Sequence, residues 1–385
     1  MNKLILHVGP GKCGSSSIQN FFMKHKNTCI EKINFVFLDP KEIAKINSAE
    51  PSKDSANYFT QLIKSSIERN SVIILSHEIF FNKPSAIKNI CAIAKNITGI
   101  DEILIIGYSR RQSEFMVSAY SQWLFRSPER IQEIKSTMRN IGIEPTQFSG
   151  LERQLIGSII NDFYSARHLS DDTILDWNKQ YMEIENLTSP FGVNVKCGVL
   201  PNKQSDKNLI EDFCTKSSLT LRSEVKGLTN IRSNLKFDNE MIEAVNIATD
   251  LGLNVPTPHR DNNFFTRNSI ITKHVDSLDD SLILILKQYI DCYYIESNIE
   301  FCRKYDLDKS YFEVSKQYSK GETLNAVKTE QLIRKKNDVM VDRYKNLIGI
   351  MAESLYHNYK METIKQPPAQ YFSIKNIFKL IKRKY

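Results

Sequence analysis

The chain has 385 residues, of which 41% are hydrophobic and 25% are charged, and it carries a formal net charge of +8. This length and composition indicate a globular protein with either one large domain or a core and a helical subdomain. Five of the eight net positive charges lie within the last fifteen residues, at Lys375, Lys379, Lys382, Arg383 and Lys384. A nucleic-acid-binding protein normally spreads basic residues over its body, so we do not expect nucleic acid as a partner.

The pattern of cysteines and of apolar runs indicates the cellular compartment in which the protein works. Seven cysteines are scattered without a Cys-x-x-Cys pair, which favours a reducing environment. The first apolar strand begins near Lys3 and reaches a glycine turn at Gly9, too early for the charged and apolar regions of a signal peptide. No apolar run approaches the roughly 20 residues that a membrane-spanning helix needs. We therefore expect a cytoplasmic protein, or one peripheral to the inner face of the cytoplasmic membrane.

The first predicted unit is a strand, a glycine-rich turn and a helix. The apolar run at residues 4–8 predicts a buried strand, and a helical pattern begins at Ser15. The turn between them contains Gly9, Pro10, Gly11 and Gly14. Such a turn leaves backbone N–H groups unpaired at the positive end of a helix dipole, and Lys12 adds a full charge. Together these features predict an anion site, with phosphate as the expected anion.

The order of residues in this turn departs from the common nucleotide-binding pattern GxxxxGK[ST]. Counted from Gly9, the second glycine falls correctly at Gly14, but Ser15 stands where the lysine should be. The order Lys-x-Gly-Ser-Ser-Ser after a strand instead resembles the 5′-phosphosulfate loop of sulfotransferases, usually Lys-Thr-Gly-Thr-Thr or Lys-Ser-Gly-Thr-Thr. Cys13 replaces the Thr or Ser. The resemblance implies that the 5′-phosphate is bound by Gly11, Lys12, Cys13, Gly14, Ser15, Ser16 and Ser17.

Two more strands are expected at residues 34–38 and 72–75, separated by a helix at 58–67. This alternation predicts a parallel α/β sheet, in which ligands bind at the carboxyl ends of the strands. His77 and Glu78 follow the third strand, and both are candidates for a general base that accepts a proton from a hydroxyl. Sulfotransferases use a histidine or a glutamate near this point. Adjacent residues leaving a strand usually face opposite ways, so we expect one of the two to act, with Glu78 preferred. The alternative is that both merely cap the strand.

A second motif follows the strand expected at residues 102–108. Arg110 lies at the turn into a helix expected at 113–125, and Ser118 lies eight residues later. This spacing resembles the 3′-phosphate site of sulfotransferases, in which a guanidinium and a hydroxyl bind the phosphate on the adenosine ribose. Arginine suits that role because its planar donors contact phosphate oxygens at two points. Arg111 is the alternative phosphate ligand.

A longer run narrows the resemblance. Residues 108–123, Tyr-Ser-Arg-Arg-Gln-x-Glu-Phe-x-x-Ser-Ala-Tyr-Ser-Gln-Trp, resemble bacterial sulfotransferases that modify capsular or lipid-linked sugars. Residues 229–251 resemble the Asn-x-Ser-then-helix element of that family. The likeness covers roughly residues 3–255 and is strong at 4–22 and 103–124. It implies 3′-phosphoadenosine 5′-phosphosulfate (PAPS) as co-substrate and a carbohydrate acceptor, either a polysaccharide or a glycolipid.

The remainder of the chain is predicted to be mainly helical. One more strand is expected at residues 191–197, between helices at 174–186 and 208–213, and residues 277–360 are mostly helical. Between residues 130 and 190 the pattern is polar and helical. Three arginines are candidates for contacts with an anionic sugar, although a solvated helix face is the favoured explanation: Arg126, Arg130 and Arg153.

The C-terminal segment has its own pattern. Pro367 and Pro368 end the helical region, and residues 371–385 place apolar side chains on one helical face and lysines on the other. This pattern predicts either an amphipathic anchor on a membrane surface or a helix docked on the body. We therefore expect an α/β domain at residues 1–255, a helical extension at 256–364, and a linker with a basic helix at 365–385.

These features combine into one hypothesis and two alternatives. In the hypothesis, Lys12 neutralises charge on the leaving phosphate, Arg110 and Ser118 hold the 3′-phosphate, and Glu78 or His77 accepts the hydroxyl proton. No histidine lies near other potential ligands at metal-binding spacing, so no metal site is expected. The first alternative is a nucleotide-dependent phosphate-loop kinase, which requires Mg²⁺. The second is an inactive sulfotransferase-like protein that binds sugar or a membrane.

Overall fold

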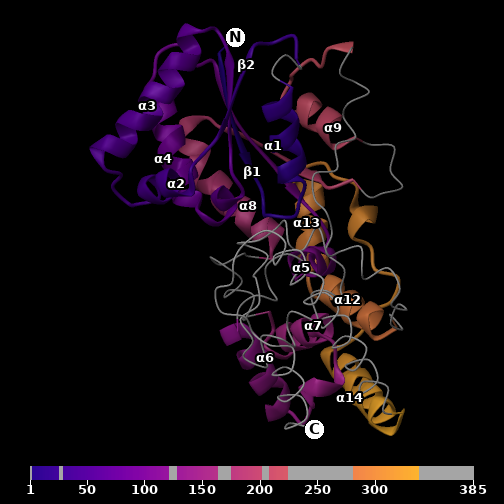
Figure 1. Cartoon of the computed structure of the whole chain (residues 1–385). Coiled ribbons are helices and arrows are strands. Elements are labelled where there is room, and N and C mark those ends of the chain that lie inside the picture. The colour runs from indigo at the N-terminus through magenta and orange to yellow at the C-terminus, as the bar shows by residue number, and fades with distance from the viewer. Residues whose placement is uncertain are drawn as a thin grey trace, which may run out of the picture. The chain divides into compact units, whose positions relative to one another are not determined.

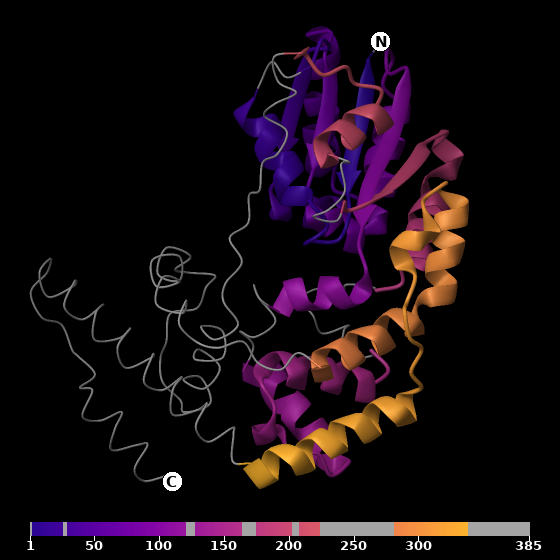
Figure 2. The same ribbon diagram turned by 90° about the vertical axis from the view of Figure 1, so that its right-hand side faces the viewer.

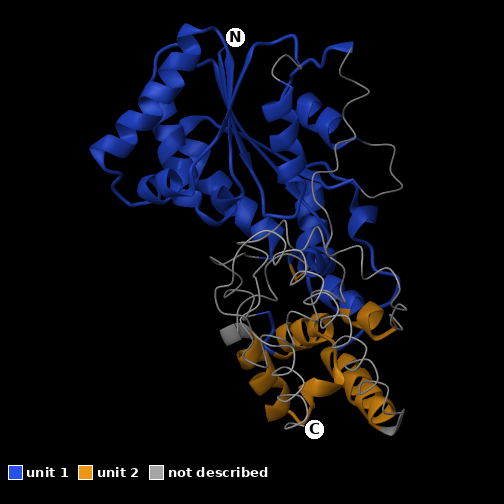
Figure 3. Cartoon of the chain, in the orientation of Figure 1, with its two compact units in different colours: residues 1–119, 161–235, 287–319 blue, residues 120–160, 236–286, 320–385 orange. Residues whose placement is uncertain are grey.

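The computed structural model describes residues 2–25, 29–120, 128–163, 175–201, 208–223 and 281–337. The chain divides into two compact units (Figure 3), each assembled from separate stretches. Unit 1 comprises residues 1–119, 161–235 and 287–319, and unit 2 comprises 120–160, 236–286 and 320–385. The domain boundaries expected near residues 255 and 365 lie outside the described residues, as do the segments 229–251 and 371–385.

Unit 1 is built on a five-stranded parallel sheet in the order β2-β3-β1-β4-β5. The strands are β1 Lys3–Val8, β2 Ile33–Phe37, β3 Val72–Ser76, β4 Glu102–Ser109 and β5 Asn194–Val199. In the central strand β1, Leu6 pairs with Leu75 of β3 on one side and Ile105 of β4 on the other, and all three side chains are fully buried. The predicted parallel α/β sheet is therefore confirmed.

Helices cover both faces of this sheet. Helices α1 (Ser15–Lys24) and α9 (Leu209–Lys216) lie on one face, and α2 (Pro40–Ile46), α3 (Lys53–Glu68) and α4 (Pro84–Lys95) lie on the other (Figure 1). Figure 2 shows α9 in front of the strands. Unit 1 also contains the following described helices: α5 (Gln112–Tyr120), α8 (Trp177–Thr188), α13 (Ile295–Lys304), the short 3₁₀ helices η1 (Glu78–Asn82), η5 (Ser189–Phe191) and η8 (Lys309–Phe312), and the end of α12 (Ser281–Tyr293). The predicted helical character of the C-terminal region is confirmed for its described residues.

Unit 2 contains α6 (Pro128–Asn140), the 3₁₀ helix η3 (Pro145–Gln147), α7 (Gly150–Ile160) and α14 (Lys320–Asn337). Most residues of helix α7 are buried, and its Glu152 is fully shielded from solvent. Arg334 of α14 donates Nη2–H to Glu152 Oε1 at 2.7 Å and Nη1–H to Glu152 Oε2 at 2.9 Å. A buried carboxylate needs such a partner because water cannot solvate it.

Of the arginines suggested as sugar contacts, the structure describes the side chain of Arg153. Arg153 is only 5% exposed and donates Nη1–H to the carbonyl oxygen of Phe148 at 3.1 Å. Arg153 therefore lies neither on a solvated helix face nor in reach of a sugar, so both interpretations were wrong for this residue. Arg126 and the side chain of Arg130 lie outside the described residues. Within the described ranges, no helix is long and apolar enough to cross a bilayer.

Candidate anion-binding site

The turn between β1 and α1 depends on glycine. At Gly9, φ is +151°, and a Cβ there would lie 3.2 Å from the backbone N and O of Tyr108, so only glycine lets the turn lie directly against β4. At Gly14, φ is +94°, and a Cβ would lie 2.6 Å from Leu209 Cδ2. Lys12 also has a positive φ of 71°, which is uncommon for a residue with a side chain. The chain therefore takes a strained path around this turn.

Gly14 is the N-cap of α1, and no side chain caps this helix. The N–H groups of Ser17 and Ile18 donate to the carbonyl oxygen of Gly14. Helices usually satisfy their first N–H groups with a Ser, Thr, Asp or Asn side chain at the N-cap. Because Gly14 has none to offer, the positive end of the α1 dipole lacks the acceptor that most helices carry there, as an anion site requires.

Arg110 reaches this turn from the end of β4. Its Nη1–H donates to the carbonyl oxygen of Lys12 at 3.2 Å, and its Nη2–H donates to Glu114 Oε2 at 2.9 Å. Its own carbonyl oxygen accepts a hydrogen bond from Trp177 Nε1 at 2.7 Å. Its Nε is buried and has no hydrogen-bond partner among the residues that the structure describes. The motif that contains Lys12 and the motif that contains Arg110 thus meet in the structure, and the Nε donor of Arg110 has no partner there.

Cys13 points into the protein. Its side chain is 1% exposed, and burial raises the pKa of the thiol to about 12, although Arg110, through its charge and its backbone N–H, and Lys12 act in the opposite direction. The thiol is therefore neutral. Because its sulfur is buried, Cys13 can contact a ligand only through its backbone.

The remaining phosphate candidates differ from one another. Ser118 lies on α5 and is half-buried. Arg111 turns to the segment at residues 287–319, where its Nε–H donates to the carbonyl oxygen of Tyr311 at 2.8 Å and its Nη1 lies 3.8 Å from Asp291 Oδ2. Asp291 in turn accepts from the N–H and Oγ–H of Ser113. Arg111 therefore fastens α5 to a distant segment, which favours Arg110 as the phosphate ligand.

His77 is held by structural contacts. Its side chain is buried, its ring centroid lies 4.9 Å from that of Phe37, and its Nδ1 accepts a hydrogen bond from the N–H of Ile79 at 3.0 Å. Burial lowers the pKa of His77, against the opposing charges of Glu78 and Asp39, so the neutral ring is favoured. In a neutral ring with an accepting Nδ1, the proton sits on Nε2. His77 then has no free lone pair with which to take a proton.

Glu78 faces α1 instead, as expected for the neighbour of His77. Its Oε2 accepts a long hydrogen bond from Gln19 Nε2 at 3.4 Å, and the same Nε2 donates to Ser76 Oγ at 3.2 Å. Ser76 Oγ lies 2.7 Å from Nδ1 of His7, a buried ring whose pKa is lowered to about 3 by desolvation. A polar chain therefore links Glu78 to the helix that follows the glycine turn.

The sequence interpretation missed Gln19 and Ser76. The available signal was a glutamine on the apolar face of α1, where it is buried beside Ile18 and Phe22. A buried amide must find hydrogen-bond partners, so its place in the pattern indicated a polar contact with the sheet.

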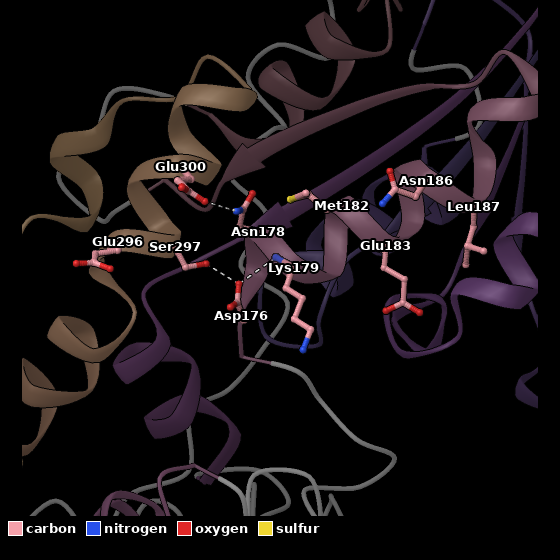
Figure 4. Close-up of a pocket in the computed structure, with 10 residues that line it drawn as sticks. All are labelled: Asp176, Asn178, Lys179, Met182, Glu183, Asn186, Leu187, Glu296, Ser297 and Glu300. Carbon is pink, nitrogen blue, oxygen red and sulfur yellow. Dashed lines mark hydrogen bonds between the residues drawn. The ribbon is translucent and has the colours of Figure 1, made fainter.

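An open cavity of about 660 Å³ lies elsewhere in unit 1, lined by α8 and α13 (Figure 4). None of the candidate residues lines it. Its carboxylates outnumber its cations, with Asp176, Glu183, Glu296 and Glu300 against Lys179. Asp176 Oδ1 accepts from the N–H of Lys179 and from Ser297 Oγ, and Glu300 accepts from Asn178, so part of this polar surface joins the two helices (Figure 4). Its charge is opposite to that of an anion site.

Among the described residues, no group of three or more His, Cys, Asp or Glu side chains is placed to hold a metal ion. No model of a known protein family and no curated protein sequence matches this chain. The chemistry must therefore be inferred from the residues that meet at the carboxyl edge of the sheet.

Proposed function

We propose that the protein is a sulfotransferase that moves the sulfuryl group of PAPS to a hydroxyl of a carbohydrate acceptor. The observation that carries the proposal is the hydrogen bond between Arg110 Nη1 and the Lys12 carbonyl, which joins residues 98 positions apart. This contact brings together the two motifs whose sequences resemble the 5′- and 3′-phosphate sites of that family. The carbohydrate acceptor is supported by the resemblance of residues 108–123 alone.

The glycine turn serves the leaving group in this proposal. As the bond between sulfur and the bridging phosphate oxygen breaks, negative charge collects on the 5′-phosphate. Lys12 and the N–H groups of Gly14, Ser15 and Ser16 would stabilise that charge, because donors fixed before the reaction need no reorganisation during it. Arg110 and Ser118 would hold the 3′-phosphate and so align the donor with the incoming hydroxyl.

Glu78 is the base in this proposal. The acceptor oxygen forms a bond to sulfur while its proton passes to the Glu78 carboxylate, which lies half-buried beside α1. His77 is the weaker candidate because its Nδ1 lone pair is engaged by Ile79. The cytoplasm, or the inner face of its membrane, is the proposed place of action.

Calorimetry with 3′-phosphoadenosine 5′-phosphate, and in parallel with ATP and Mg²⁺, tests the donor. We expect the bisphosphate to bind, and we expect the binding to weaken by about 10- to 150-fold in Arg110→Ala. Arg69→Ala is the control, because Arg69 is an exposed arginine after α3, at the opposite edge of the sheet. Binding of ATP alone would favour the kinase alternative.

Lys12→Ala tests the chemistry. Removing one preorganised stabiliser of transition-state charge typically costs about 10²–10³ in turnover. We therefore expect turnover to fall by that order while affinity for the bisphosphate changes much less. Near-normal turnover would rule out this role for Lys12. Donor binding without any turnover in the unmodified protein would favour the inactive alternative.

A further inference from the structure

One negative charge stands inside the proposed 3′-phosphate site. Glu114 lies one helical turn after Arg110, and its Oε2 accepts the hydrogen bond from Arg110 Nη2 at 2.9 Å. The arginine side chain is 18% exposed and that of the glutamate is 41% exposed. The carboxylate therefore lies on the open side of the guanidinium.

The geometry of the guanidinium makes this position important. A phosphate held at two points uses two neighbouring nitrogens, either Nε with Nη2 or Nη1 with Nη2. Both pairs include Nη2, the nitrogen bonded to Glu114. Of the other two, Nη1 donates to the Lys12 carbonyl and Nε is buried. A phosphate can therefore gain a two-point contact only by sharing or replacing Glu114 at Nη2.

Sharing is unfavourable because two anions at one nitrogen repel each other. Replacement is inexpensive because a partly exposed carboxylate regains water when it rotates away. The arginine itself stays in place, since Trp177 holds its backbone carbonyl oxygen and the Lys12 carbonyl accepts a hydrogen bond from its Nη1. We therefore expect the Glu114 side chain to move when the ion pair breaks, while Arg110 keeps its position.

We propose that Glu114 is the internal counter-ion of Arg110 and that an incoming 3′-phosphate displaces it. The inference rests on the proposed function, and it assigns Glu114 as a residue that determines specificity. A nucleotide with a 3′-phosphate replaces the carboxylate and gains the guanidinium. A nucleotide without that group leaves the pair intact and gains nothing from Arg110.

Glu114→Gln tests the exchange, because glutamine keeps the shape and the accepting oxygen but removes the charge. Exposed ion pairs change equilibria by about two- to fivefold. We expect Glu114→Gln to bind 3′-phosphoadenosine 5′-phosphate tighter by that factor and to bind adenosine 5′-phosphate as before. Glu330→Gln is the matched control, because Glu330 pairs with Arg334 at the same spacing in unit 2. It should change neither affinity.

Weaker or unchanged binding of the bisphosphate by Glu114→Gln would overturn the inference, as would an equal gain for adenosine 5′-phosphate. If the unmodified protein binds neither nucleotide, the proposed function fails, and inorganic pyrophosphate then decides the counter-ion role. Tighter pyrophosphate binding by Glu114→Gln that Arg110→Met abolishes would support the exchange, and unchanged binding would overturn it.

Discussion

Two arginines in this protein, one in each unit, form ion pairs of the same spacing in different surroundings. Arg334 donates from Nε to Glu330, from Nη1 to Glu152 and the carbonyl of Gln147, and from Nη2 to Glu152. Its side chain is 9% exposed, so all three nitrogens are used in a closed environment. Arg110 also has a glutamate four residues away, but its Nε has no described partner and its glutamate is partly exposed.

The difference lies in what each guanidinium still has to offer. All three nitrogens of Arg334 donate to protein acceptors, and its side chain holds α14 to α7. Arg110 lies beside a glycine turn and an uncapped helix, and its Nε donor has no partner among the described residues. The candidate site therefore differs from the structural ion pair in an unused hydrogen-bond donor on the arginine and in the greater exposure of its glutamate.

Breaking the structural pair should have the largest effect. In Arg334→Met, the fully buried Glu152 would lose its cation, and such a change costs about 3–5 kcal/mol of the free energy of unfolding. Urea denaturation measures the loss, and binding of 3′-phosphoadenosine 5′-phosphate should not change. The double variant Arg334→Met with Glu152→Met should recover most of the stability. A loss no larger than that of an exposed pair would contradict the assignment.

The same contrast between structure and chemistry applies to Glu78 and His77. General bases contribute about 10²–10⁴ to turnover, so Glu78→Gln should lower turnover at least about a hundredfold. His77→Gln should mainly lower stability, because His77 contacts Phe37 and caps η1. Turnover at saturating donor and acceptor, together with urea denaturation, separates the two. The reverse pattern would make His77 the base.

Arg110→Met provides the counterpart to Arg334→Met. Hydrogen bonds to charged groups contribute about 1.5–3 kcal/mol, so affinity for the bisphosphate should fall by that amount, measured by calorimetry. Stability should fall less than in Arg334→Met, since Glu114 is partly exposed and can be solvated. A variant that loses stability but keeps its affinity would show that Arg110 is structural after all.

Acid should lower the stability of unit 1, because its buried histidines His7 and His77 favour the neutral form. His7 has a pKa lowered to about 3 by burial, and burial also lowers the pKa of His77. The unfolded chain therefore binds more protons as the pH falls from 6.5 toward 3, and stability is lost in that window. The slope for one group is at most about 1.4 kcal/mol per pH unit. Urea denaturation at pH 7 and pH 5 should show a smaller difference in His7→Gln, and an unchanged difference would exclude His7.

The strands and helices could be predicted from the sequence where short, local patterns determine them. The apolar run before Gly9 and the serines after Gly14 correctly predicted β1 and α1, and β3 and β4 each extend one residue past the predicted end. Helix α3 begins at Lys53, five residues before the predicted start, because Ser52 Oγ accepts from the N–H of Ser55 and caps it. The capping serine outweighed the polar composition of the first turn.

The site was readable only in part. Lys12 and Arg110 each follow a strand of the predicted parallel sheet, and in the structure Arg110 Nη1 donates a hydrogen bond to the Lys12 carbonyl oxygen. The contacts of Arg111 with Tyr311, 200 residues away, and of Glu78 with Gln19 could not be predicted. Such contacts depend on how side chains pack between distant segments, which periodicity does not encode.

The sequence distance between Lys12 and Arg110 also has a consequence for synthesis. The turn is braced by the backbone of Tyr108 and by the guanidinium of Arg110, and both come about a hundred residues later. At translation rates of about 5–20 residues per second, a nascent chain would wait some 5–20 seconds before these braces leave the ribosome. For most of that interval neither β3 nor β4, the two neighbours of β1, has been synthesised. The glycine turn therefore takes its shape late, when the central strands assemble.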